Sequence, residues 1–122
     1  MTKEEVEHII KRYPFIRQAI ESGLPEITYY IGKRKYYDRI TEEVKGVCSI
    51  ILAVLDAEQD QSVRFMITGI LKGKTDTNIM KDLPLSRTTY YFCKIKFMDK
   101  VEKACASKGI ITFEEILKER IA

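Results

Sequence analysis

The sequence predicts an all-α fold in which N-terminal helices and one central apolar helix pack on a C-terminal helix-turn-helix with a long second helix. Apolar residues recur every three or four positions through most of the 122 residues, as they do on one face of an α-helix. Small polar residues that favour helix N-termini precede several of these runs. Glycine and proline separate the runs, so each run is predicted to be a separate helix.

Composition places the chain among globular proteins. Hydrophobic residues make up 45% and charged residues 32% of the sequence, enough for one apolar core. No apolar run approaches the ~18 residues of a membrane span, and the first residues lack the apolar segment of a secretory signal. We therefore expect a cytoplasmic location and no membrane partner. The cysteines have no metal-binding spacing and are expected to be reduced and mostly buried: Cys48, Cys93 and Cys105.

A helix that a proline interrupts is predicted at the N-terminus. Thr2 and Glu5 have the spacing of a capping box, which begins a helix. Pro14 is tolerated in a first turn but not in mid-helix, so we expect a break near Tyr13 and a second helix to Glu21. One apolar stripe follows both helices: Val6, Ile9, Ile10, Tyr13, Ile16 and Ile20. We expect this stripe to pack on the central helix of the same chain, with a homodimer interface as the alternative.

Residues 26–35 favour strand formation but show no partner strand, so they are expected to form a turn or an extended connector around Gly32. From about Tyr36 to Ala57 the apolar spacing is helical and covers more than half of the circumference, which is typical of a central helix. Gly46 marks a weak position in that helix or a close helix contact. Four basic residues lie near its start: Lys33, Arg34, Lys35 and Arg39.

The C-terminal half has the spacing of a helix-turn-helix. Polar caps predict a helix over residues 63–71, a short helix over residues 77–83 and a long helix from Ser86 to about residue 106. The turn before Ser86 contains Pro84, where such motifs usually carry glycine. The inner face of the long helix is expected to hold Tyr90, Cys93, Phe97, Val101 and Ala104.

These elements divide the chain into three parts that differ in charge. Residues 1–58 are an N-terminal helical part for packing or oligomerisation, residues 60–108 hold the helix-turn-helix, and residues 109–122 form a short helix that reaches Ile121. Residues 71–108 contain nine Lys/Arg against four Asp/Glu, a net charge of +5 in a chain of net charge +3. Such a concentration favours a surface that meets a polyanion.

The sequence contains no pattern that is typical of an active site. The sequence has a single histidine, His8, and no phosphate-binding, hydrolase or metalloprotease motif. Its two pairs of glutamates, at residues 4–5 and 42–43, stand at predicted helix starts, where carboxylates complement the helix dipole. We therefore expect the protein not to be an enzyme, and we expect neither a metal ion nor a cofactor.

The first turn of the long helix is the part of such a motif that reaches base edges in the major groove of DNA. The candidate DNA contacts are Lys74, Arg87, Thr88, Tyr91, Lys94 and Lys96. Arg87 is suited to a guanine edge, Thr88 to a thymine methyl group, and Tyr91 to a base or a phosphate. The three lysines are candidates for phosphate contacts. Phe92 and Ile95 are expected instead to pack on the N-terminal segments.

The run Leu-Ser-Arg-Thr-Thr-Tyr-Tyr at residues 85–91, followed by a basic helix, resembles the C-terminal region of the ArpU/RinA-type phage transcriptional regulators. The likeness covers residues 50–106 and extends to residues 1–45 in general layout. It implies a small phage or prophage activator of late genes. Its C-terminal part would be similar to region 4 of bacterial sigma factors, which reads promoter DNA through a helix-turn-helix. RNA polymerase is then a candidate partner besides double-stranded DNA.

These features favour a sequence-specific DNA-binding regulator of transcription, whose long helix is the DNA-reading helix. Two other classes of protein stay open. Small terminase subunits, which package phage DNA, also combine a helix-turn-helix with helical oligomerisation segments. A protein–protein interaction module, in which the basic helix meets an acidic partner, is the third class.

Overall fold

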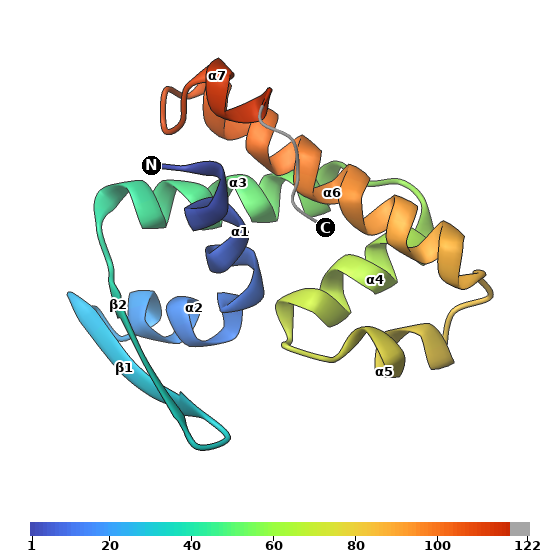
Figure 1. The fold of residues 1–122 in the computed structure, drawn as a ribbon, viewed down its shortest axis with the longest axis horizontal. Coiled ribbons are helices and arrows are strands. Elements are labelled where there is room, and N and C mark those ends of the chain that lie inside the picture. The colour runs from blue at the N-terminus through green and yellow to red at the C-terminus, as the bar shows by residue number, and fades with distance from the viewer. Residues whose placement is uncertain (118–122) are drawn as a thin grey trace.

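The computed structural model describes residues 1–117 and shows a mostly helical fold with one β-hairpin (Figure 1). The long helices α3 and α6 contact one another, and α1 lies against both. The helical prediction is confirmed for most of the chain, but the fold is not strictly all-α. In chain order the elements are α1 (Lys3–Lys11), α2 (Tyr13–Glu21), β1 (Glu26–Ile31), β2 (Arg34–Arg39), α3 (Glu42–Ala57), α4 (Gln61–Leu71), α5 (Asp76–Lys81), α6 (Arg87–Ser107) and α7 (Phe113–Ile116).

The first two helices follow the predicted capping and break. The Thr2 hydroxyl accepts a hydrogen bond from the Glu5 amide at 3.1 Å, and the Glu5 carboxylate accepts one from the Thr2 amide at 3.2 Å. This reciprocal pair is the capping box that satisfies two amides at the start of α1. Arg12 separates α1 from α2, and Pro14 lies in the first turn of α2, where its missing N–H leaves no helical hydrogen bond unmade.

Strands β1 and β2 form an antiparallel hairpin, which corrects the predictions for this segment. Residues 26–35 are not a lone connector, and the central helix does not begin near Tyr36 but at Glu42. Gly32 has a φ of +61°, which suits the first central position of a tight two-residue hairpin turn. The turn brings residues 34–39 back along β1 as its partner strand. Tyr36 and Tyr37 therefore lie on opposite faces of a hairpin and do not belong to a helical stripe.

The apolar stripe of the first two helices is buried within its own chain. Helix α1 contacts α3, α4 and α6, and α2 contacts α3. The stripe therefore packs on α3 and its neighbours in the same chain, as expected. The five most buried members of the stripe are at most 3% exposed: Val6, Ile9, Ile10, Tyr13 and Ile16.

Gly69 permits a close approach of α4 and α5. A Cβ at this position would lie 2.8 Å from Cγ1 of Ile79, which is buried. We expect Gly69→Ala to lower the free energy of unfolding by about 1–3 kcal/mol, because the core has no room for the methyl group. Gly46→Ala is the matched control, since its Cβ would meet only the end of the Ile110 side chain, at 3.3 Å. Denaturant titrations measure both variants, and equal stabilities would contradict a tight α4–α5 contact.

The C-terminal segment ties back to the start of the chain. The Thr112 hydroxyl accepts a hydrogen bond from the Glu115 amide at 3.4 Å, as predicted for the cap of α7. The Glu115 carboxylate accepts a hydrogen bond from the Lys3 amide at 3.1 Å, so it holds the first turn of α1. The expected extension of this last helix to Ile121 lies outside the described residues.

The cysteine prediction is confirmed. Cys48 and Cys105 are buried, Cys93 is half-buried, and all three are free thiols. Burial raises the pKa of Cys48 and of Cys105 to about 11, so both stay protonated at neutral pH. Within residues 1–117, no helix has the length and apolar character needed to cross a membrane.

Candidate nucleic-acid interface

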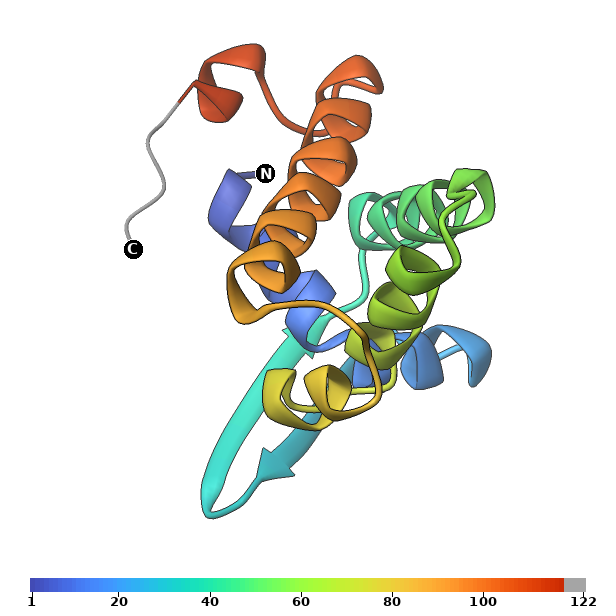
Figure 2. The same cartoon turned by 90° about the vertical axis from the view of Figure 1, so that its right-hand side faces the viewer.

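Helices α4 and α5 lie on the same side of the molecule as the start of α6, whose other end runs to α7 (Figure 1 and Figure 2). Helix α4 contacts both of the others, and short connections over residues 72–75 and 82–86 join the three in order. The predicted caps are present at both later helices. The Thr75 hydroxyl accepts from the Asn78 amide at 3.3 Å, and the Ser86 hydroxyl accepts from the Thr89 amide at 3.2 Å.

A buried cluster around Asp76 fixes α6 against the start of α5. The Tyr90 hydroxyl donates a hydrogen bond to Asp76 at 2.6 Å, and the Lys94 ammonium donates to both carboxylate oxygens, at 3.0 and 3.1 Å. The Tyr90 ring is fully buried and the Asp76 and Lys94 side chains are about three-quarters buried. Charge-assisted hydrogen bonds in such surroundings define one orientation for α6.

The environment shifts the pKa values in this cluster. Burial alone would raise the pKa of Asp76, but the hydrogen bonds from Tyr90 and Lys94 outweigh burial and lower it from its ordinary value. Burial, together with the hydrogen bond to Asp76, raises the pKa of Tyr90. The carboxylate is therefore charged and the phenol neutral at neutral pH, which is the state that the hydrogen bonds need.

Acid should weaken the fold through this cluster. The pKa of Asp76 is lower in the folded state than its ordinary value of 3.8. The Asp76 carboxylate therefore contributes fully to stability above pH 3.8, and this contribution is lost as the pH falls through the lowered pKa. Asp76→Asn should therefore be less stable than the wild type at neutral pH, and the difference should shrink below pH 3.8. Denaturation across that range measures the difference. A difference that does not depend on pH would contradict the role given to the Asp76 charge.

The first turn of α6 carries two of the predicted DNA contacts on the surface. Arg87 and Thr88 are exposed. The Arg87 guanidinium lies 5.7 Å from the centre of the Tyr91 ring, which is half-buried and meets the Tyr90 ring edge-on at 5.2 Å. Lys96 is exposed further along the helix. These side chains can reach a ligand without any change in the packing of α6.

The other two predicted lysines differ from one another. Lys74 is exposed in the connection between α4 and α5. Lys94 lies on the side of α6 that faces α5, and its ammonium is bound to Asp76. Lys94 therefore holds the two helices together and does not present an unpaired charge to solvent.

Phe92 and Ile95 overturn a prediction. They were expected to pack on the N-terminal segments, but their side chains are 66% and 47% exposed. With Thr88 they are spaced at i, i+4 and i+7, so all three project from the outer face of α6. Two large apolar side chains on that face were missed as functional candidates. The signal was available, because the buried positions Tyr90 and Phe97 place Phe92 and Ile95 opposite the core.

An apolar groove runs beside Phe92. It has a volume of about 210 Å³ and lies between α6 and the helices α3 and α4. Lys100 at its rim forms an ion pair of 3.3 Å with Glu58. The apolar part of the wall is formed by Val54, Val63, Ile67, Phe92, Cys93 and Phe97.

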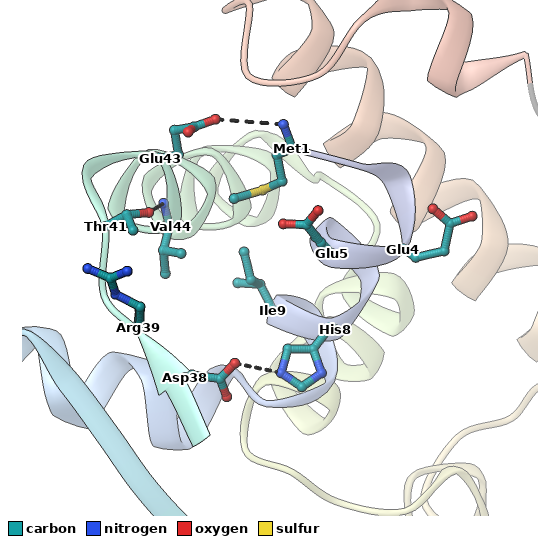
Figure 3. A pocket seen from close by; sticks show the side chains of 10 residues that line it. All are labelled: Met1, Glu4, Glu5, His8, Ile9, Asp38, Arg39, Thr41, Glu43 and Val44. Carbon is teal, nitrogen blue, oxygen red and sulfur yellow. Dashed lines mark hydrogen bonds and ion pairs between the residues drawn. The ribbon is translucent and has the colours of Figure 1, made fainter. Parts of the chain in front are cut away.

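A larger groove, of about 530 Å³, lies between α1, the end of β2 and the start of α3 (Figure 3). It contains the single histidine of the chain. His8 Nε2 lies 2.9 Å from one oxygen of Asp38, and the other oxygen accepts a hydrogen bond from Tyr29 at 2.5 Å. The Thr41 hydroxyl is occupied as the cap of α3, where it accepts from the Val44 amide. His8 and Asp38 thus join α1 to β2, and Thr41 caps α3.

No cluster of three His, Cys, Asp or Glu side chains able to hold a metal ion occurs in residues 1–117. Comparison with family models, curated proteins and solved structures found no match to the chain. The function is therefore argued from the geometry of α4, α5 and α6.

Proposed function

We propose that this protein is a sequence-specific DNA-binding regulator of transcription in which α4, α5 and α6 act as a helix-turn-helix. The observation that carries the proposal is that one face of α6 is buried in the core while its first turn is exposed. Tyr90 anchors the helix in the core, while Arg87 and Thr88, in the first turn, are left exposed. This is the part of a recognition helix that meets base edges in the major groove.

The exposed side chains have complementary chemistry for base recognition. Arg87 presents a bidentate donor for the O6 and N7 atoms of guanine. Thr88 and Phe92 present apolar groups that fit thymine methyls. Lys74 and Lys96 are exposed and are the candidates for phosphate contacts, and Tyr91 stays a candidate for a base or phosphate contact. Lys94 acts indirectly, by holding α6 on α5 through Asp76.

The resemblance to the ArpU/RinA-type regulators extends the proposal. It suggests a phage or prophage protein that acts in the bacterial cytoplasm, has RNA polymerase as a partner and performs no catalytic step. The net charge of +5 over residues 71–108 agrees with a surface for double-stranded DNA.

Selection of binding sequences from random DNA duplexes tests the proposal. The wild type should enrich one motif, and binding to that motif should weaken with salt at a log–log slope of roughly −3 to −5, as expected for ~3–5 phosphate contacts. Lys11→Ala, an exposed change on α1, serves as a control that should enrich the same motif. Failure to enrich any motif, or a slope near zero, would refute the DNA-binding function.

A protein-interaction module is a second candidate, and one observation favours it. Phe92 is 66% exposed beside an apolar groove, and exposed apolar surface of this kind also occurs at protein interfaces. The two functions predict different losses for Phe92→Ala. A DNA-reading residue should change the selected motif at one or two positions, whereas an interface residue should leave the motif unchanged.

A further inference from the structure

The hairpin of β1 and β2 is held on the helices by its inner face. The Tyr29 ring stacks on the rings of Phe15 at 4.4 Å and Tyr36 at 5.6 Å between centroids. Its hydroxyl donates to Asp38, and the second oxygen of Asp38 pairs with His8. Helices α1 and α2 therefore both hold the hairpin. A two-stranded hairpin is marginal by itself, so these contacts are what keep it in place.

The outer face of the hairpin contributes nothing to the core. Tyr30 and Tyr37 lie on this face and are 62% and 54% exposed. Tyr30 belongs to β1 and Tyr37 to β2. In the register of the hairpin, Tyr30 lies opposite Lys35 and Tyr37 lies opposite Thr28. The outer face thus combines exposed aromatic and basic side chains, while the inner face is packed on α1 and α2.

The tip of the hairpin is strongly basic. At the tip, Lys33 and Lys35 are exposed, and neither forms an ion pair with any residue from 1 to 117. Arg39 lies at the other end of the hairpin, in register with Glu26. The two carboxylates of the strands lie at the end of the hairpin away from the tip, where Glu26 is in register with Arg39 and Asp38 with Ile27. A surface of this kind fits a polyanion, whose phosphates accept hydrogen bonds from lysine, arginine and tyrosine.

The hairpin also projects toward the side of the molecule where α5 lies. Figures 1 and 2 both show the tip and α5 at the lower side, opposite α7. Figure 1 shows the start of α6 at the right and the tip at the lower left, so only a duplex that extends well beyond the α6 site along the lower side would reach the tip. Charge complementarity therefore favours the flanking backbone of the same DNA as the partner of the hairpin.

We propose that the hairpin is a second DNA-binding element, whose tip residues Lys33 and Lys35 bind phosphates beside the base pairs that α6 contacts. The inference rests on the proposed DNA-binding function and adds a contact to it. Because phosphates carry no sequence information, the hairpin raises affinity for any duplex and does not change the preferred sequence.

The test compares two double variants that each remove two exposed lysines. Lys33→Ala with Lys35→Ala changes the tip, and Lys103→Ala with Lys108→Ala changes the C-terminal end of α6. The variant with both hairpin lysines removed (the hairpin pair) should bind about tenfold more weakly at low salt. Its log–log salt slope should be shallower by about 2, which is about 1 for each lysine removed. The loss should be equal on the selected and on a scrambled duplex. The α6 pair lies away from the proposed contacts and should lose clearly less affinity than the hairpin pair.

The outcomes separate this inference from the proposed function. If the wild type binds no duplex, both fail. If the wild type binds its selected motif and the two double variants have the same affinity as one another, only the hairpin inference is overturned. Thermal melting checks that each variant is folded, and Lys33→Gln with Lys35→Gln repeats the measurement with polar side chains. A duplex trimmed to the α6 site should remove the difference between the hairpin pair and the wild type, and a persisting difference would exclude a flanking contact.

Discussion

Tyr90→Ala is expected to remove about 3–5 kcal/mol from the free energy of unfolding, as other large-to-small changes in cores do. The ring is fully buried, and its hydroxyl is one of the two groups that hold the Asp76 carboxylate. A domain of this size has a total stability of about 5–15 kcal/mol. The loss is therefore a large fraction of the total, and the variant should unfold at a much lower denaturant concentration than the wild type. Denaturant titration followed by circular dichroism measures the loss.

Two further variants identify the source of that loss. Tyr90→Phe keeps the ring and removes only the hydrogen bond to Asp76, so it should lose about 1–3 kcal/mol. Tyr37→Ala removes a ring of the same size from an exposed position and should change stability little. If Tyr90→Ala and Tyr37→Ala were equally stable, α6 would have to be rotated away from the orientation described here.

Local signals in the sequence predicted the helices well. Thr2 and Ser86 cap helices as expected, because a cap needs only a polar side chain and an amide two or three residues away. The break at Arg12 has an equally local cause in Pro14. Such features require no knowledge of the rest of the chain.

The hairpin was missed because its partner strand also fits another pattern. Tyr37 and Ile40 continue the three- and four-residue spacing of α3, so the segment was assigned to a helix. The decisive contacts come from elsewhere in the chain, where Phe15 stacks on Tyr29 and His8 pairs with Asp38 across 30 residues. Tertiary contacts of this kind override a local pattern.

In the candidate site, too, local spacing predicted some features, whereas contacts between distant residues could not be predicted. The helical spacing correctly placed Tyr90 and Phe97 in the core and Arg87 on the surface. The pairing of Lys94 with Asp76 joins residues 18 apart on different helices, and no pattern within α6 indicates it. Lysine at that position therefore looked like a phosphate contact, whereas the structure gives it a positioning role.

Arg87→Ala is expected to weaken binding to the selected duplex by about 1–3 kcal/mol, the loss typical of a bidentate contact to guanine. Binding to a scrambled duplex should weaken much less, because only a contact to a base edge distinguishes the two sequences. Thermal stability should change by no more than about 1 kcal/mol, the value of an exposed cation–π contact such as the one to Tyr91. Titrations with both duplexes and a melting curve measure all three quantities.

Arg87→Lys separates the geometry of the contact from its charge. Lysine keeps the positive charge but cannot form the planar pair of hydrogen bonds, so specific binding should fall nearly as far as in Arg87→Ala, with little change on scrambled DNA. Full retention of specificity in Arg87→Lys would show that a positive charge suffices at residue 87 and would contradict the bidentate geometry. An equal loss on both duplexes for Arg87→Ala would make residue 87 a phosphate contact, and base recognition would then have to rest on Thr88 and Phe92.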